Sequence, residues 1–156
     1  MKEFKGFEKI STADGSFTFR SCHYDETFHS TGGAFTEALE RFILPCRIGP
    51  LSVEMGKIHI LDVGFGLGLN LAVLLYFLKK ENLKPEIHIT SLEKDEEVLK
   101  ILSSFSPLAE LAEEHQIIQS LARNQRFEEG NIKAKILLGK GEERIREMEE
   151  KYDAGF

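Results

Sequence analysis

The sequence predicts an α/β fold in which an incomplete parallel sheet follows an N-terminal β-hairpin and a helix. From residue 57 onward, short apolar runs of strand length alternate with helical patterns, which is typical of parallel strands joined by right-handed crossovers. Before residue 57, the pair Asp14-Gly15 lies between two alternating apolar runs, and this is a strong hairpin signal. A glycine-rich segment joins the first parallel strand to the helix after it.

Periodicity and end signals place the individual elements. Strands at 7–11 and 16–21 flank the hairpin turn, and Thr31-Gly32-Gly33 opens a helix that Pro45 and Pro50 end. The helix expected at 69–80 is apolar on nearly every side, so we expect it to be buried. The other expected elements are strands at 57–63, 86–92, 132–138 and 152–156 and helices at 95–102, 107–124 and 142–150.

Composition excludes several classes of protein. With 156 residues, 42% apolar and 29% charged, the chain is expected to form one globular domain. No apolar run can span a bilayer and the N-terminus lacks a signal core, so we expect a cytoplasmic protein without a membrane partner. Cys22 and Cys46 are predicted to be reduced packing residues, and no histidine pair has metal-ligand spacing. The net charge of −6 without a basic block argues against an RNA-binding surface on this chain.

The segment Asp62-Val-Gly64-Phe-Gly66-Leu-Gly68 indicates the ligand. Glycines let the backbone approach a ligand closely, and the helix that follows adds the positive end of its dipole. The spacing does not fit the dinucleotide pattern G-x-G-x-x-G, because leucines stand where the third glycine would fall. The form D-x-G-x-G-x-G is instead typical of Rossmann-like methyltransferases that use S-adenosylmethionine (SAM).

The motif residues have expected roles in holding SAM. The glycine loop passes close under the cofactor with its N–H groups facing the cofactor's carboxylate, and Asp62 binds the ammonium group of the methionine moiety directly or through water. Asn70 either caps the helix or contacts the cofactor. The alternative for the whole segment is a structural glycine turn that binds nothing.

Three further residues are candidates for the same site. Glu93 ends the second strand, where an acid can accept hydrogen bonds from both ribose hydroxyls, or it is a plain helix-start acid. Glu142 follows the third strand and can accept a hydrogen bond from the adenine amino group, whereas Lys140 at the same turn cannot. The alternative is that Glu142 is an ordinary acid at the start of a helix. His29 lies in a polar, glycine-ended stretch that is either part of the site or a plain turn.

Several segments taken together resemble one family. Their combination is similar to the MnmC-type methyltransferases of tRNA 5-methylaminomethyl-2-thiouridine synthesis, and the match is best to the N-terminal portion of stand-alone versions without the FAD-dependent oxidase domain. The resemblance covers most of the chain. The segments are Thr12–Ser16, Tyr24–Ser30, Gly33–Ala38, Pro45, Leu61–Asn70 and Thr90–Glu93.

The resemblance implies a Rossmann-like SAM-dependent methyltransferase fold. Residues 1–56 are then an N-terminal hairpin and helix extension, and residues 57–156 the first half of the SAM-binding domain. The implied reaction transfers a methyl group from SAM to the amine of 5-aminomethyl-2-thiouridine at the tRNA wobble position. Residues implied at the cofactor are Gly64, Gly66, Gly68 and Asn70, with Glu93 at the ribose and Tyr24 and His29 near the methionine end.

Two departures from the family bear on activity. The family has Gly-Asp after the third strand, where this chain has Gly139-Lys140, and this weakens the adenine contact. The family's acid or base beside the substrate amine lies in an Asp-x-Phe-x-Pro segment that would follow Phe156, and Asp153 matches only the first acid of that motif. We therefore expect no catalytic residue within the chain and little or no turnover. Contacts with tRNA are expected to come from regions outside it. The parallel sheet would then have an open edge, which is suited to self-association.

Other functions fit parts of the pattern. A Rossmann-like methyltransferase of another substrate shares the glycine motif. A non-catalytic domain that keeps the fold as a binding or assembly module is favoured by Lys140 and by the end of the chain at Phe156. A NAD-binding oxidoreductase is disfavoured by the glycine spacing.

Overall fold

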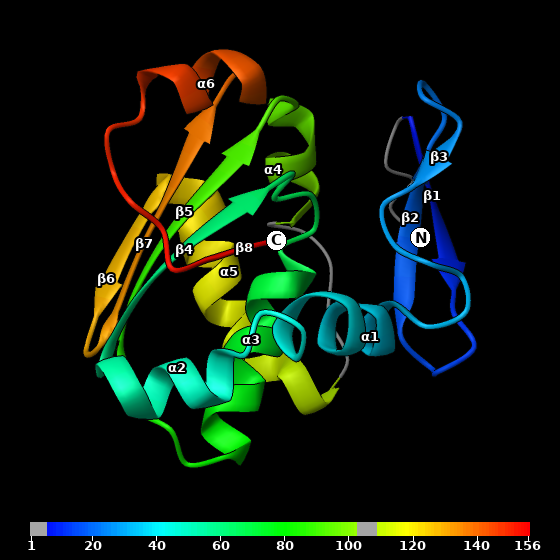
Figure 1. Cartoon of the computed structure of the whole chain (residues 1–156). Helices are drawn as coiled ribbons and strands as arrows, with labels where there is room; N and C mark the ends of the chain where they lie inside the picture. Colours follow the sequence, from blue (N-terminus) through cyan, green and yellow to red (C-terminus); the bar gives the residue numbers. More distant parts are fainter. Residues whose placement is uncertain (1–5, 103–108) are drawn as a thin grey trace.

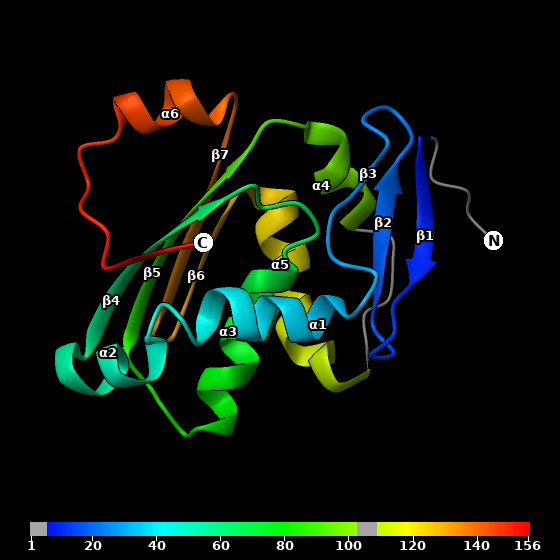
Figure 2. The same cartoon turned by 45° about the vertical axis from the view of Figure 1, so that its right-hand side comes forward.

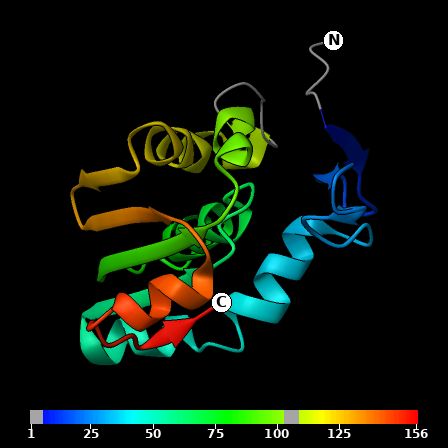
Figure 3. The same cartoon turned by 90° about the horizontal axis from the view of Figure 1, so that it is seen from above.

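The computed structural model describes residues 6–102 and 109–156. These residues form a three-stranded antiparallel sheet near the N-terminus and a five-stranded, mostly parallel sheet in the rest of the chain (Figure 1). The N-terminal sheet stands beside the main sheet, and α1 leads from one to the other (Figure 3). The predicted α/β class is confirmed.

The N-terminal sheet contains the hairpin that Asp14-Gly15 predicts. Strands β1 (Phe7–Ser11) and β2 (Phe17–Ser21) pair antiparallel. A third strand, β3 (Glu26–Thr27), was not expected, because two residues are too few to show a period. The Asp14 carboxylate accepts hydrogen bonds from the Ser16 N–H at 3.0 Å and from the Thr36 N–H at 3.0 Å. It therefore ties the turn to the helix that begins at residue 34.

Helices α1 and α2 connect the two sheets. Helix α1 (Ala34–Glu37) continues directly into the π-helical segment η1 (Ala38–Ile43), which ends before Pro45 as predicted. The prediction that Pro50 is a stop is wrong, because Pro50 lies in the first turn of a second helix, α2 (Ile48–Met55). Proline is tolerated there because the first N–H groups of a helix have no intrahelical partner.

The main sheet has the strand order β6-β7-β5-β4-β8. Strands β4 (Lys57–Val63), β5 (Glu86–Glu93), β7 (Ile132–Leu138) and β8 (Ala154–Gly155) are parallel, and all four lie where strands were predicted. Strand β6 (Arg126–Glu129) is antiparallel to β7 and was not predicted. Its sequence Arg-Phe-Glu-Glu contains one apolar residue, so it lacks the signal of a strand.

Three helices cover one face of the main sheet. They are α3 (Leu69–Lys80), α4 (Glu96–Leu102) and α5 (Ala112–Asn124), and a short 3-10 turn, η2 (Ala109–Leu111), precedes α5. The helix start predicted at residue 107 lies outside the described residues. Helix α6 (Gly141–Glu147) and the segment leading to β8 lie toward the other face (Figure 2).

The core lies between the main sheet and these helices. Alternate residues of the central strands, among them Ile58, Ile60, Ile87 and Ile89, are buried against the apolar side of α3 and α5. In the described parts of the chain no helix is both long and apolar enough to cross a membrane. Both cysteines are free, but only Cys46 is partly buried against the core, so the packing role predicted for the exposed Cys22 is wrong.

Candidate cofactor site

The glycine loop connects β4 to α3 at the carboxyl ends of the parallel strands, which is where open α/β sheets bind ligands. Gly64, Gly66 and Gly68 have φ angles of +84°, +52° and +66°, a region that residues with side chains rarely adopt. A Cβ atom at Gly68 would lie 2.4 Å from Cγ2 of Ile118, and one at Gly66 would lie 3.1 Å from Cδ1 of Phe28. A side chain at Gly68 would therefore clash with a buried neighbour, and one at Gly66 would need Phe28 to move by a few tenths of an ångström.

The N–H groups of this loop bind protein atoms. Those of Gly64 and Phe65 both donate to the Leu92 carbonyl at 2.9 Å, and that of Gly68 donates to the Phe65 carbonyl at 2.8 Å. The Gly66 N–H donates to Oε2 of Glu93 at 2.7 Å. The prediction that these groups face a cofactor carboxylate is therefore wrong for the three glycines, because the end of β5 supplies acceptors for Gly64 and Gly66 and the loop itself supplies one for Gly68.

Asp62 lies near the end of β4 and is only 1% exposed. Its Oδ2 accepts a hydrogen bond from the Ser91 hydroxyl at 2.8 Å, whereas its buried Oδ1 has no partner among the described residues. Burial raises the pKa of Asp62 to about 6, the Ser91 hydrogen bond opposes this, and the nearby charge of Glu93 adds to it. A buried carboxylate oxygen without a partner suits a cationic donor such as an ammonium group.

Asn70 is the second residue of α3 and presents a similar unpaired acceptor. Its Oδ1 is buried without a hydrogen-bond partner in the described part of the chain. The cap of α3 is Gly68, and no side chain caps this helix. Of the two roles expected for Asn70, helix capping is therefore wrong, and contact with a ligand is the one that its free acceptor fits.

Glu93 is the last residue of β5 and is 7% exposed. Besides the Gly66 N–H, its carboxylate accepts the Asp95 N–H, through Oε1 at 2.9 Å. Each carboxylate oxygen can accept a second hydrogen bond, so both can also receive donors from a ligand. The two backbone bonds hold the carboxylate still beside the glycine loop.

A cavity of about 170 Å³ lies between the N-terminal sheet and the end of β5. The Lys94 ammonium sits over the Tyr24 ring at its rim, 4.3 Å from the ring centroid, in a cation–π contact. The cavity thus places Tyr24 beside Glu93, the residue expected to hold the ribose, whereas the resemblance implied a position near the methionine end. Its lining residues are Ser21, Tyr24, Glu26, Thr27, Phe28, Glu93, Lys94, Asp95 and Val98.

The two remaining candidates do not line this cavity. His29 Nδ1 lies 3.5 Å from Oε2 of Glu37, and burial lowers the pKa of His29 although the charge of Glu37 acts in the opposite direction. Glu142 is exposed in the first turn of α6, next to the exposed Lys140. In the residues that the structure describes, no cluster of three His, Cys, Asp or Glu side chains could hold a metal ion.

Sequence reasoning missed two residues that shape the site. Ser91 pairs in register with Asp62 on the neighbouring strand and supplies its hydrogen bond. A hydroxyl within a buried strand, directly beside the position of the motif acid, was the available signal. Phe28 packs against Gly66 from the N-terminal part of the chain, and no local pattern predicts such a long-range contact.

Comparisons with known proteins agree with this geometry. No protein-family model matches the chain. An uncharacterised protein of Methanocaldococcus jannaschii is 28% identical over 154 residues, covering 94% of this chain and 40% of that protein. The crystal structure of MnmC2 from Aquifex aeolicus matches with 40% identity and a TM-score of 0.82, covering 97% of this chain and 48% of that one. The chain spans less than half the length of either protein.

The structural match bears directly on the family that the sequence suggested. The match extends over both sheets, because it covers 97% of this chain. Its sequence identity of 40% is well above the level at which two proteins share only a fold. The Rossmann-like fold class is confirmed with it. The fold and the 40% identity to MnmC2 thus support the interpretation of this chain as an MnmC-type methyltransferase domain.

Proposed function

We propose that this chain is the SAM-binding part of a methyltransferase that acts on the wobble uridine of tRNA. The observation that carries the proposal is the buried Oδ1 of Asp62, which has no partner among the described residues and lies at the base of the glycine loop. The similarity to MnmC2 supports the tRNA substrate. The proposed reaction converts 5-aminomethyl-2-thiouridine to 5-methylaminomethyl-2-thiouridine.

The described residues fit SAM in three places. The free acceptors of Asp62 and Asn70 suit the ammonium group of the methionine moiety. The fixed carboxylate of Glu93 suits the two ribose hydroxyls. We further propose that residues 1–56 are an extension that closes the site, with Tyr24 forming its wall on the nucleoside side. Residues 57–156 are then the SAM-binding part, in which Glu142 approaches the adenine from α6.

The chemistry requires little of these residues beyond binding and orientation. SAM supplies a methyl group on a positively charged sulfur, and transfer to an amine needs the two reactants in line. The amine must be unprotonated, which calls for a nearby base. We assign no such base to a described residue. The contribution of this chain is to hold the cofactor with its methyl group at the carboxyl end of the sheet.

Methyl transfer is tested with SAM labelled on the methyl group and tRNA that carries 5-aminomethyl-2-thiouridine. We expect label only in that nucleoside, at a rate far below that of the Aquifex aeolicus MnmC2 protein. Label in another nucleoside would contradict the proposed substrate. SAM binding without any transfer would favour a binding module, and absence of both would overturn the proposal as a whole.

Replacing Phe28 with alanine is expected to loosen the glycine loop from the side of the N-terminal sheet. The ring lies against Gly66, whose N–H binds Glu93, so its removal leaves the loop and the carboxylate less fixed. We expect a stability loss of about 1–3 kcal/mol, because the side chain is only partly buried, and a several-fold weaker binding of SAM. Thermal unfolding and calorimetric titration measure the two effects.

The matched control for this prediction is Phe28→Leu, which keeps most of the apolar contact. It is expected to bind SAM nearly as tightly as the wild type. A folded Phe28→Ala variant with unchanged SAM affinity would show that the N-terminal sheet does not shape the cofactor site.

A further inference from the structure

The first turn of α1 is capped by the hairpin turn of the N-terminal sheet. The N-cap residue of this helix is Gly33, which has no side chain, and the first N–H groups of a helix lack intrahelical partners. Oδ2 of Asp14 accepts the Thr36 N–H at 3.0 Å and the Thr36 hydroxyl at 2.9 Å. The Ser16 hydroxyl oxygen accepts the Ala34 N–H at 3.1 Å. The acceptors that α1 lacks therefore come from the turn between β1 and β2.

Both oxygens of the Asp14 carboxylate are used in this contact. While Oδ2 binds α1, Oδ1 accepts the Thr12 hydroxyl at 2.8 Å and the Ser16 N–H at 3.0 Å. Desolvation raises the pKa of Asp14, but the hydrogen bonds outweigh it and hold the pKa well below its ordinary value. Gly33 makes room for the carboxylate, because a Cβ there would lie 2.7 Å from Oδ2.

The stretch of chain that carries Phe28 is fastened to the same elements. The Ala13 N–H, beside Asp14 in the hairpin turn, donates to the Thr31 carbonyl at 3.0 Å. The Ser30 N–H donates to Oε2 of Glu37 in α1 at 2.7 Å. At the start of this stretch, the Phe28 ring lies against the glycine loop. The position of that ring therefore depends on how the hairpin turn and α1 are joined.

Helix α1 in turn rests on α3, the helix that begins at the glycine loop. The rings of Phe35 and Tyr76 meet edge to face, with their centroids 5.7 Å apart. Figure 3 shows α1 leading from the N-terminal sheet to the main sheet. The contact between the hairpin turn and α1 thus connects the N-terminal sheet to the helix on which the cofactor site is built.

We propose that Asp14 is a positioning residue for the cofactor site, although its hydrogen-bond partners lie in the hairpin turn and in α1. By capping α1, it holds the N-terminal sheet where Phe28 meets Gly66 and where Tyr24 forms a wall of the cavity. A site held in its binding conformation binds more tightly, because less order has to be imposed by the ligand. The inference rests on the proposed function, since its effect is measured as SAM affinity.

The variant Asp14→Asn tests this role without removing the hairpin. Asparagine before glycine also suits a hairpin turn, but its amide has one acceptor oxygen and turns an NH₂ group toward N–H and O–H donors. By calorimetry we expect several-fold weaker SAM binding. By NMR of the free chain we expect faster hydrogen exchange of the Phe28 and Ser30 N–H groups. A purely structural role would lower stability without either effect.

A double-variant cycle shows whether Asp14 acts through Phe28. In the Phe28→Ala background, Asp14→Asn is expected to have almost no further effect on SAM affinity, because the contact that it maintains is already lost. The variant Thr36→Ala removes one donor to Asp14 at an exposed position and keeps a good helix former. It should weaken SAM binding in the same direction by less, and it provides the test should Asp14→Asn not fold.

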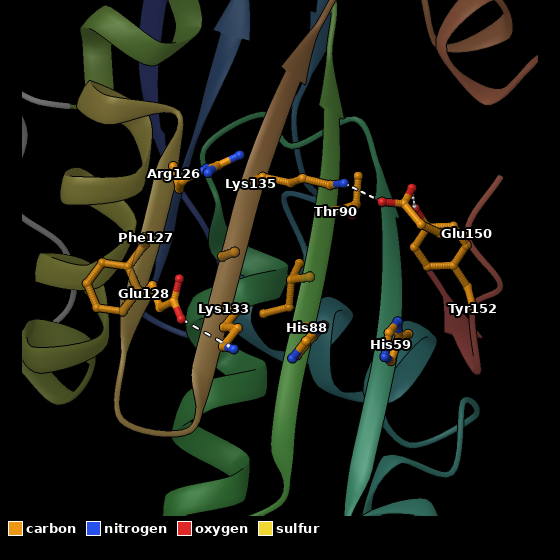
Figure 4. Close-up of a pocket in the computed structure, with 12 residues that line it drawn as sticks. His59, His88, Thr90, Arg126, Phe127, Glu128, Lys133, Lys135, Glu150 and Tyr152 are labelled. Atoms are coloured by element: carbon orange, nitrogen blue, oxygen red, sulfur yellow. Dashed lines mark hydrogen bonds and ion pairs between the residues drawn. The ribbon is translucent and has the colours of Figure 1, made fainter. Parts of the chain in front are cut away.

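The matched control is Glu150→Gln, which also replaces a carboxylate that fastens two segments. Glu150 accepts the Lys135 ammonium at 2.5 Å and the Tyr152 hydroxyl at 3.0 Å (Figure 4). Lys135 pairs in register with Thr90 in the middle of β5, before the carboxyl end where the glycine loop lies. We expect this variant to lower the midpoint of unfolding and to leave SAM affinity unchanged.

The possible outcomes separate this inference from the proposed function. A wild type that binds no SAM would refute the proposed function and this inference with it. Where the wild type does bind, the inference alone fails on any of three results. They are unchanged SAM affinity in a folded Asp14→Asn variant, equal weakening by Glu150→Gln, and additive effects of Asp14→Asn and Phe28→Ala.

Discussion

Replacing Gly68 with alanine is expected to destabilise the chain by about 2–4 kcal/mol and to abolish SAM binding. Two costs add at this position. The residue has a φ of +66°, and its Cβ would lie 2.4 Å from Cγ2 of Ile118, a fully buried branched side chain of α5 that has no room to move. Because Gly68 also caps α3, any shift that relieves the clash moves the start of this helix and the loop before it.

The matched control is Gly64→Ala in the same loop. Gly64 also has a positive φ, +84°, but no atom lies within 4 Å of the position of its Cβ. We therefore expect the backbone cost alone, about 1–2 kcal/mol. Denaturant unfolding compares the two variants. A Gly68→Ala, Ile118→Ala double variant, which removes the clashing Cγ2, should lose less stability than the sum of the two single variants. Equal effects of Gly64→Ala and Gly68→Ala would show that the contact with Ile118 is unimportant.

Replacing Asp62 with asparagine is expected to weaken SAM binding at least tenfold while making the free chain more stable at neutral pH. Asparagine keeps the shape and the acceptor but removes the charge that attracts an ammonium group, a difference of about 1.5–3 kcal/mol. The free chain gains because a buried carboxylate without a cation is costly to ionise. Titration calorimetry and thermal unfolding at neutral pH measure the two effects.

The raised pKa of Asp62 also fixes the direction of a pH effect. Its value is about 6 in the folded chain against 3.8 ordinarily, so the folded state binds the proton more tightly than the unfolded state. The contribution of Asp62 to stability is therefore full below pH 3.8 and falls by roughly 3 kcal/mol as the pH rises through 6. SAM needs the ionised carboxylate, so its affinity is expected to rise from pH 5 to pH 7.

Ser91→Ala provides the control for this pH effect. It removes the hydrogen bond that favours the ionised carboxylate, so the rise in SAM affinity should move to higher pH while binding at high pH is retained. Asp62→Asn should show no such rise. If Asp62→Asn bound SAM as tightly as the wild type, the ammonium contact would lie elsewhere.

The elements with strong periodicity could be predicted to the residue. Strand β4, helix α3 and strand β7 match their expected bounds, because each is a clear apolar run between polar or glycine ends. Strands β3 and β6 were missed because one is too short and the other too charged to show a period. Helix α2 was missed because Pro50 was interpreted as a stop, although it occupies a first turn that tolerates proline.

The sequence predicted only those residues of the candidate site that lie in the glycine motif or at the end of the next strand. Asp62, the three glycines and Glu93 lie on one motif and the strand after it, and the structure gathers them at one end of the sheet. The contacts of Tyr24 and Phe28 with this group depend on how the N-terminal sheet packs, which no spacing reveals.

Titration calorimetry of this chain with SAM, with NADH as the control ligand, tests the central claim most directly. We expect saturable binding of SAM at one site, at least tenfold weaker binding in Asp62→Asn, and no binding of NADH. A folded chain that binds NADH, or that binds SAM equally well with and without the Asp62 carboxylate, would contradict the assignment of the glycine loop as a SAM site.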